Sequence, residues 1–156
     1  MDDRDKSASF VVGESPRRST SSLDSRGINV IDHFNLPVRD LARSRSFYER
    51  VLAPLESRFL AEDGQAIGFG SATWQFGIIA TPSPIPKLHV AFRARSRTAV
   101  DAFYKEALAA GAKSNGGPGV RRQYDPEYYA AFVLDPDGHN VEAVFRGRPG
   151  VAQAHR

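Results

Sequence analysis

The sequence predicts an α+β fold in which one unit, a strand followed by a helix and three further strands, occurs twice. The first observation is an internal repeat, because laying the chain on itself with a shift of 56 residues needs no gap and gives six identities among the 21 positions from 33 to 53. The second observation is that strand-like and then helical patterns follow in the same order in both copies. The identical pairs are His33 with His89, Arg39 with Arg95, Phe47 with Phe103, Tyr48 with Tyr104, Leu52 with Leu108 and Ala53 with Ala109.

Each copy opens with a strand and continues into an amphipathic helix. Residues 28–38 and 88–94 have strand-like patterns. Asp40 and Ser96 then supply side chains of the N-cap type. In the second copy apolar residues recur from position 100 to 108 at helical spacing, and Gly111 is a typical C-terminal stop.

Short strands follow each helix and are separated by turn signals. In the first copy we expect strands over 57–61, 66–71 and 74–81, with Asp63-Gly64 as a turn. In the second copy we expect strands over 128–134 and 140–145, joined by the turn 135–138, and we interpret the glycine-rich run 115–119 as a turn before them. The three prolines of 81–86 suit an extended connector between the copies.

The domain boundaries follow from composition. Residues 1–27 hold few large apolar side chains and are predicted to be a disordered tail. Residues 147–156 are predicted to be a second loose tail. We therefore expect one folded domain over 28–146, with module one at 28–82, a linker at 81–86 and module two at 87–146.

Composition and charge exclude several classes of protein. No apolar run approaches the roughly 18 residues that cross a bilayer, and the N-terminal residues lack the order of a secretory signal, so we expect no membrane span and a cytoplasmic location. The excess of 21 basic over 18 acidic residues is small and the arginines are scattered, which argues against nucleic acid as a partner. Because the chain has no cysteine, a metal ion would need histidine and carboxylate ligands.

Three residues on predicted strands could hold such an ion. His33 and His89 occupy the same place in the two copies, so a pseudo-twofold arrangement of the copies would bring their imidazoles together. Glu142 lies between Val141 and Ala143 on the last strand, where an unpaired buried carboxylate would be costly. Two histidines and one carboxylate form a facial triad that leaves positions open for water and substrate. The alternative is that each histidine is a hydrogen-bonded core residue and that Glu142 pairs with an arginine.

These residues resemble the vicinal oxygen chelate superfamily, which includes glyoxalase I, extradiol dioxygenases, fosfomycin-resistance thiol transferases and bleomycin-binding proteins. The resemblance covers about 28 to 146 and is carried by the runs 31–34, 38–41, 47–48, 88–90 and 129–142, the last of which contains Asp135-Pro136-Asp137-Gly138. It implies paired βαβββ modules in a U-shaped mixed sheet around a divalent metal (Fe, Mn, Zn or Ni), with His33, His89 and Glu142 as ligands. It also implies a small-molecule substrate and a homodimer.

No single branch of the superfamily matches fully. Glyoxalase I adds a carboxylate from the last strand of the first module, whereas this chain has Gln75 or Gly77 at that place. The extradiol dioxygenases add an acid/base histidine, whereas the corresponding segment 121–125 has none. The fosfomycin transferases carry a threonine two residues after the first histidine, and Asn35 occupies that position here.

The resulting hypothesis is a metal-dependent glyoxalase- or dioxygenase-like enzyme that chelates a small oxygen-containing or aromatic substrate, with lyase, dioxygenase and thiol transferase activities left open. Glu142 would double as proton acceptor, and Tyr124, or alternatively Tyr128 or Tyr129, would act as proton donor. The alternative is a metal-free protein that sequesters a drug or antibiotic, like the bleomycin-resistance members. The residues assigned to substrate binding are Asn35, Arg93, Arg121, Arg122, Tyr128 and Trp74.

Overall fold

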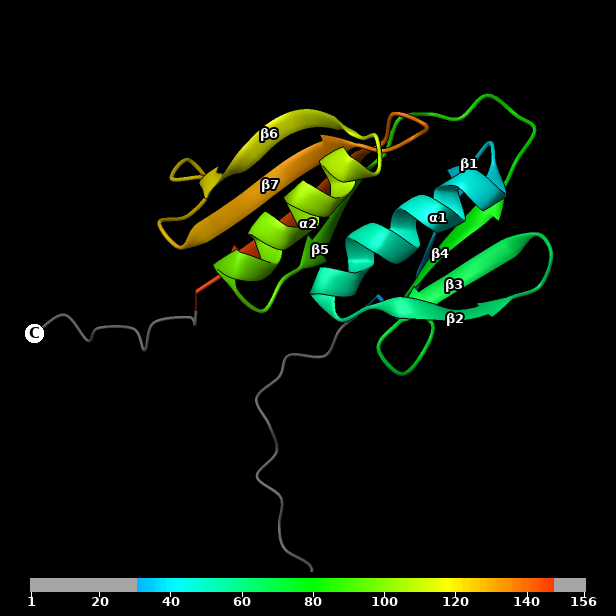
Figure 1. The fold of residues 1–156 in the computed structure, drawn as a ribbon, viewed down its shortest axis with the longest axis horizontal. Coiled ribbons are helices and arrows are strands. Elements are labelled where there is room, and N and C mark those ends of the chain that lie inside the picture. Colours follow the sequence, from blue (N-terminus) through cyan, green and yellow to red (C-terminus); the bar gives the residue numbers. More distant parts are fainter. Residues whose placement is uncertain (1–30, 148–156) are drawn as a thin grey trace, which may run out of the picture. The chain divides into compact units, whose positions relative to one another are not determined.

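The structure, a computed structural model, describes residues 31–147 (Figure 1). The predicted tail 1–27, the first residues of the predicted opening strand and positions 148–156 lie outside this range. The elements in chain order are β1 (Phe34–Val38), α1 (Leu41–Leu52), the 3-10 turn η1 (Ala53–Leu55), β2 (Arg58–Glu62), β3 (Ala66–Gly70), β4 (Phe76–Ala80), β5 (His89–Arg93), α2 (Arg97–Ala109), β6 (Lys113–Val120), β7 (Tyr128–Leu134) and β8 (Asn140–Arg146).

Each module forms a four-stranded mixed sheet with the same topology, which confirms the predicted α+β fold of two tandem units. The strand order is β1-β4-β3-β2 in the first sheet and β5-β8-β7-β6 in the second. In both sheets the opening strand runs parallel to the last strand, and the other neighbours are antiparallel. The two modules therefore place equivalent residues at equivalent positions of their sheets.

The two helices begin at the predicted caps. The Asp40 carboxylate accepts the backbone N–H of Arg43, and the Ser96 hydroxyl accepts the N–H of Ala99, so each cap satisfies one free amide of the first turn. After α2 the chain reverses at Gly111, whose φ of +88° is accessible to glycine at little cost. Helices α1 and α2 lie side by side in Figure 1 and are joined by the ion pair of Arg50 with Glu106.

One hydrophobic core is shared by the helices and by one face of each sheet. The rings of Phe76 on β4 and Phe92 on β5 meet edge to face with centroids 5.0 Å apart, so the core is continuous from one module to the other. The opposite face of each sheet, called the open face below, is turned away from this core. Its residues alternate with the core residues along each strand. The fully buried core side chains are Leu36, Val38, Tyr48, Val51, Leu52, Phe69, Ile78, Val100, Phe103, Ala107, Ala131, Val133, Val141 and Ala143.

The predicted turn at 115–119 is wrong, because this segment is part of strand β6. Glycine and proline are poor strand residues, yet β6 is the outer strand of its sheet, where Pro118 is tolerated without a ladder hydrogen bond. The pairing with β7 shifts at Gly116 and again before Gly119, so the strand is irregular. The predicted opening strand also differs, since β1 begins at Phe34 and residues 31–33 are not in a strand.

A buried polar network joins the modules beneath the core. The Tyr48 hydroxyl donates to Asp135 Oδ2 at 2.7 Å. His139 is fully buried and uses both ring nitrogens: Nδ1 accepts from the Leu88 N–H at 3.1 Å, and Nε2 donates to the Pro37 carbonyl at 2.9 Å. Burial and the Asp135 carboxylate raise the pKa of Tyr48 well above 10. His139 is therefore a structural residue that connects the two modules. No helix among residues 31–147 has the length and apolar character needed to cross a membrane.

Candidate functional site

His89 and Glu142 form the centre of the candidate site. They lie on adjacent parallel strands, where His89 is opposite Asn140 and Ala91 is opposite Glu142, so both side chains point to the open face of the second sheet. His89 Nε2 and Glu142 Oε2 are 3.2 Å apart. The Glu142 side chain is 3% exposed and the His89 side chain 51%, which gives a buried carboxylate beside a ring that solvent can reach. We call this pair the half-site.

Tyr128 holds the second oxygen of the carboxylate. Its hydroxyl donates to Glu142 Oε1 at 2.6 Å. Burial, and then the hydrogen bond and charge of Glu142, raise the pKa of Tyr128 to about 12, so the phenol remains a proton-carrying donor at neutral pH. The Arg146 guanidinium lies over the same ring, 4.6 Å from its centroid. Glu142 is thereby fixed with Oε2 directed at His89. Among residues 31–147 no arginine pairs with it, contrary to the alternative considered from sequence.

Two asparagines orient the imidazole of His89. The Asn140 backbone carbonyl lies 3.0 Å and its side-chain nitrogen 2.9 Å from His89 Nδ1. Asn115 donates to Asn140 Oδ1 at 3.0 Å, which directs the Asn140 amide nitrogen toward the ring. Asn140 therefore serves either tautomer, since it can donate to an unprotonated Nδ1 or accept from a protonated one. In the second case Nε2 presents a lone pair toward Glu142.

The donor set of the half-site fits a divalent cation. An imidazole lone pair and a carboxylate oxygen 3.2 Å apart repel unless a proton or a metal ion lies between them, and both are ordinary ligands of Fe, Mn and Zn. Hydrogen bonds to the far sides of both groups are the usual support of metal ligands. Within residues 31–147 no three histidine, aspartate or glutamate side chains gather closely enough to hold an ion, so the chain alone supplies two of the three predicted ligands.

His33 is not brought to the half-site within one chain. It precedes β1, its side chain is 54% exposed, and its Nδ1 is 2.9 Å from Asp32 Oδ1. The first sheet has no carboxylate at the position that corresponds to Glu142. By the register of β1 with β4, Asn35 lies opposite Gly77, and Gly77 is thus the counterpart of Glu142 in the first sheet.

Trp74 covers the open face of the first sheet at this place. Gly68 and Gly77 face each other across β3 and β4, and the indole lies directly on both. A Cβ on Gly77 would approach Asn35 Oδ1 to 2.1 Å and Trp74 Nε1 to 2.9 Å, so Asn35 and Trp74 meet above this glycine. The Trp74 Nε1 is shielded from solvent and has no hydrogen-bond partner among the described residues. Trp74 is therefore not part of the core beneath the helices. It lies on the open face of the first sheet, and it is one of the residues that the sequence assigned to substrate binding.

The comparisons with known proteins agree with this geometry. The sequence profile of the Glyoxalase/Bleomycin resistance protein/Dioxygenase superfamily matches residues 30–143. The chain belongs to this superfamily. A curated relative, the metallothiol transferase FosB of Shouchella clausii, is 30% identical over 121 residues, which are 74% of this chain and 79% of the relative.

Solved structures of the superfamily have the same fold. A glyoxalase/bleomycin resistance protein from Albidiferax ferrireducens aligns with a TM-score of 0.64 and 27% identity over 74% of this chain and 98% of the other. The fosfomycin resistance protein FosX from Mesorhizobium loti aligns with a TM-score of 0.58 and 20% identity over 78% and 95% of the two chains. These alignments show that the described chain has the fold of the superfamily.

The remaining predicted residues of this superfamily member divide into two groups. Arg121 and Tyr124 line a hollow of about 580 Å³ that reaches Phe132 and Asn140 beside the half-site. Arg122 is exposed and does not line it, and Arg93, exposed at the end of β5, shares the open face with His89. Tyr124 is 64% exposed and touches the Tyr128 ring rather than Glu142.

Sequence reasoning missed Asn115 and Asn140 as supports of His89. Asn140 was recognisable from its place in the run 135–142, two residues before Glu142. Asn115 was hidden because its glycine-rich neighbours indicate a turn, and only the path of β6 beside β7 brings it to Asn140.

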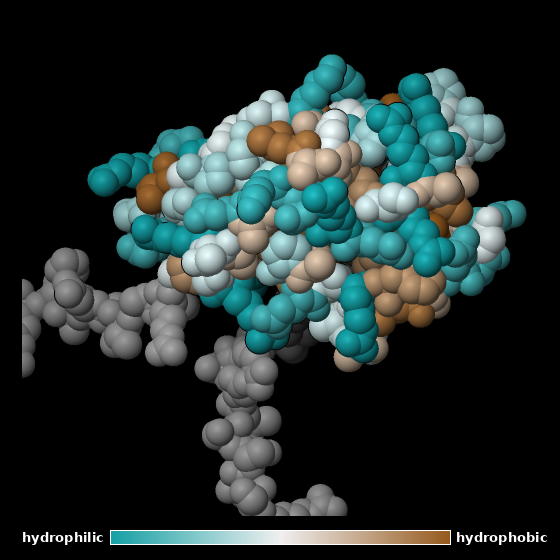
Figure 2. Space-filling view, viewed as in Figure 1, coloured by the Kyte–Doolittle hydropathy of each residue, from teal (hydrophilic) through white to brown (hydrophobic). Residues whose placement is uncertain are grey.

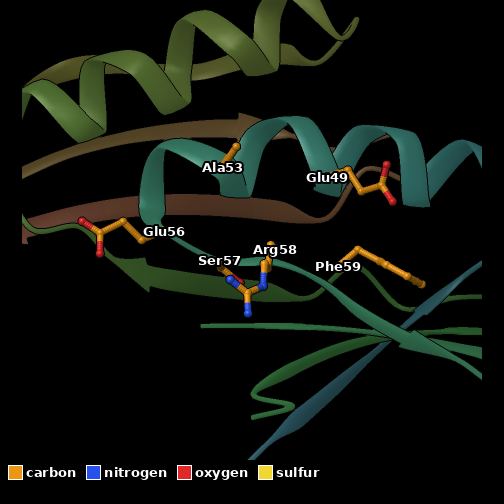
Figure 3. Close-up of a pocket in the computed structure, with 6 residues that line it drawn as sticks. All are labelled: Glu49, Ala53, Glu56, Ser57, Arg58 and Phe59. Carbon is orange, nitrogen blue, oxygen red and sulfur yellow. The ribbon is translucent and has the colours of Figure 1, made fainter. Parts of the chain in front are cut away.

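A second hollow lies elsewhere and carries none of the predicted residues. It measures about 530 Å³ and is formed by the end of α1 and the start of β2, with Glu49, Glu56, Arg58 and Phe59 around it (Figure 3). On the face drawn in Figure 2 hydrophobic residues lie in small groups separated by hydrophilic ones. Of these two hollows, the one beside the half-site has a lining residue, Asn140, that contacts a candidate ligand.

Proposed function

We propose that this chain is a metal-dependent enzyme that holds a small oxygen-containing substrate on a divalent ion bound by His89 and Glu142. The observation that carries the proposal is the 3.2 Å approach of His89 Nε2 to Glu142 Oε2 on an open sheet face. A buried carboxylate whose other oxygen is held by Tyr128 suits a ligand better than a surface ion pair, because its position is fixed before any ion arrives.

Among the branches left open by sequence, thiol transfer has the strongest support. The relative at 30% identity is named a metallothiol transferase. The resemblance to the fosfomycin transferases implies two histidines and one glutamate as ligands, and this chain has residues of these types at the corresponding positions. Glyoxalase-type chemistry has weaker support, since Gly77 occupies the place of the additional carboxylate. When bound, the ion supplies Lewis-acid stabilisation of negative charge that develops on a substrate oxygen.

The chain's own residues supply position and protonation state around that ion. Tyr128 orients Glu142 by donating to Oε1. For Nε2 to act as a ligand, the Nδ1 proton of His89 would be accepted by the Asn140 backbone carbonyl, and the Asn140 amide nitrogen, 2.9 Å from Nδ1, would turn away from the ring. The exposed edge of His89 leaves the other side of the site to substrate and water.

The third ligand, His33, comes from a second copy of the chain in this proposal. His33 is exposed, and its module has Gly77 where the other module has Glu142. His33 therefore has no carboxylate partner at that position of its own sheet with which to bind a metal ion. Both β1 and β5 are edge strands, and pairing the open face of one copy's first sheet with the other copy's second sheet would complete two identical sites by a twofold axis. This agrees with the homodimer predicted from sequence.

A metal-free binding protein is the second candidate. The observation that favours it is that residues 31–147 bring only two candidate ligands together. In that case the open face and its hollow would bind a small molecule without chemistry, and His89 would simply donate to Glu142.

Elemental analysis of the untagged protein, purified without chelators, tests the main proposal. We expect about one equivalent of Fe, Mn, Zn or Ni per chain, lost in Glu142→Gln, which keeps the size of the side chain and an acceptor for Tyr128. No ion bound, and none taken up on reconstitution, would favour the metal-free protein. A Glu142→Gln protein that retains its ion would contradict the ligand assignment.

Mixing two variants tests the origin of the third ligand. His33→Ala and Glu142→Gln are each expected to lose the ion, and unfolding and refolding them together should restore about a quarter of an equivalent per chain, because half of randomly assembled dimers are mixed and each mixed dimer has one intact site of two. No recovery in a mixture that dimerises would show that His33 does not act across the dimer.

A further inference from the structure

The hollow beside the half-site contains one positive charge and no negative one. It measures about 580 Å³, within the range of small-molecule sites, and is lined by Asn115, Arg121, Gln123, Tyr124, Phe132 and Asn140 among others. No carboxylate lines it. A ligand entering this hollow therefore meets neutral hydrogen-bonding groups, aromatic rings and a single guanidinium.

The backbone of Arg121 is fixed at the end of β6. Its N–H donates to the Tyr128 carbonyl at 2.7 Å, and its own carbonyl accepts from the N–H of Tyr124 at 2.9 Å. Arg121 thus closes the loop that connects β6 to β7, and its Cα is held against the strand that carries Tyr128.

The side chain of Arg121 is also held in place. Nη2 donates to the Gly117 carbonyl at 2.5 Å, and the guanidinium lies over the Phe132 ring, 5.4 Å from its centroid. The missing side chain of Gly119 makes room for it, since a Cβ there would be 3.0 Å from Nη1. A guanidinium ordered in advance loses little entropy when it binds an anion.

The charge of Arg121 is not neutralised within the described part of the chain. Between residues 31 and 147 no aspartate or glutamate oxygen lies within 4.0 Å of its nitrogens, whereas Arg45, Arg50 and Arg95 all form such pairs. A guanidinium has five N–H donors, and the Gly117 carbonyl uses one of them. The remaining donors are available to a planar or tetrahedral oxyanion.

The hollow borders the half-site at Phe132 and Asn140. Phe132, on which Arg121 lies, stacks against the His89 ring with centroids 6.4 Å apart and planes 27° from parallel. Asn140 lines the hollow and contacts His89 Nδ1. One small molecule can therefore contact Arg121 at one end and approach His89 and Glu142 at the other.

We propose that Arg121 forms an anion-binding site and that the substrate is a small acid, with a carboxylate, phosphonate or phosphate group held by Arg121 over Phe132. The proposal rests on the proposed function for where the reacting end of the substrate lies. The position of the substrate's acid group rests on Arg121 alone. It separates Arg121 from Arg122, which follows it in sequence but does not line the hollow.

Calorimetric titration of the full chain in the presence of a chelator tests this site apart from any metal. The probes are benzoate and phenylphosphonate, which distinguish a carboxylate from a phosphonate site, with neutral benzamide as the matched control. We expect Arg121→Gln to weaken binding of the preferred anion by about tenfold or more, the usual loss for a hydrogen bond to a charged group. Arg121→Lys should recover part of the affinity because it keeps the charge but loses the fork.

Arg122→Gln is the matched control and should leave the affinity unchanged. Equal weakening by Arg122→Gln and Arg121→Gln would overturn the proposal, because it would indicate general surface charge. Binding of benzamide as tight as that of the anions, no anion binding at all, or full affinity in a folded Arg121→Gln protein would also overturn it. None of these results depends on whether Glu142 and His89 bind an ion, so the proposed function fails or stands separately.

Discussion

The first and second modules have the same topology but differ at one pair of facing residues on their open faces. In the first sheet Asn35 lies opposite Gly77, while in the second sheet Ala91, the counterpart of Asn35 56 residues later, lies opposite Glu142. The first module covers its glycine with the Trp74 indole, and the second directs its carboxylate at His89. The two copies thus share a fold, and at this place of the described sheets the second has a carboxylate where the first has a glycine.

Filling the glycine of the first module should have the largest effect on stability. Gly77→Ala places a Cβ 2.1 Å from Asn35 Oδ1 and 2.9 Å from Trp74 Nε1, and although the amide can rotate away, the indole must leave the sheet. We expect a loss of about 3 kcal/mol in the free energy of unfolding, measured by urea denaturation.

A double-mutant cycle sharpens this prediction. In a Trp74→Ala background the Gly77→Ala substitution should cost less than half as much, because the obstructing ring is gone. Gly117→Ala is the control, since the nearest atom to its Cβ is 3.8 Å away, and it should change stability little. An undiminished cost without the indole would mean that Trp74 is not what excludes a side chain here.

Two tyrosines at equivalent positions should also behave differently. Tyr48 donates to Asp135 of the other module in a buried network, whereas Tyr104 donates to Ser114 of its own module at a more exposed place. Tyr48→Phe leaves Asp135 Oδ2 buried without this donor and should cost about 1–3 kcal/mol, and Tyr104→Phe should cost less.

Alkaline titration gives a sign to the same comparison. Because the pKa of Tyr48 is raised above 10 in the folded chain, its contribution is complete below the ordinary tyrosine pKa and is lost as the pH rises above 10 toward the folded value. The stability difference between the natural chain and Tyr48→Phe should therefore shrink above pH 10. A difference that grows in that range would contradict the assignment.

Removing the hydroxyl that supports Glu142 should affect the second module alone. Tyr128→Phe keeps the ring beneath Arg146 but removes the donor to Oε1, and if the half-site binds a metal we expect a tenfold to hundredfold weaker affinity by competition with a chelator dye. Tyr124→Phe, which removes a hydroxyl that makes no bond to Glu142, is the control and should leave the affinity as it is.

The helix caps should give the smallest difference between modules. Asp40→Ala and Ser96→Ala each remove an acceptor from a first-turn amide and should cost about 1 kcal/mol in thermal or urea unfolding. Only the Asp40 effect should decrease with added salt, because Asp40 also places a negative charge at the positive end of α1. Asp40→Asn, which keeps the cap without the charge, should be salt-independent.

The sequence predicted the repeated architecture well because strand and helix periodicity and the caps at Asp40 and Ser96 are local signals. It failed at 113–120, since an outer strand accepts glycine and proline that the composition assigns to a turn. The sequence also predicted that His89 and Glu142 lie on the same face of the sheet. This prediction was possible because side chains alternate between the two faces along each of the two paired strands.

The supports of the site were beyond local signals. Tyr128 reaches Glu142 although its backbone neighbour on β8 is Arg146, and Asn115 reaches Asn140 from the outermost strand. These contacts depend on side-chain length and on the irregular path of β6. The separation of His33 from the half-site depends on how the two sheets pack on one shared core. The residue pattern of a single strand does not reveal that packing.

The position of Trp74 has a practical consequence. It is the one tryptophan of the chain, and it lies on the open face of the first sheet rather than among the phenylalanines of the core. Its emission at long excitation wavelength therefore reports on that face alone. Any molecule or second chain that covers the first sheet would shift this emission without a label, while unfolding of the second module around His89 could be followed independently through its tyrosines.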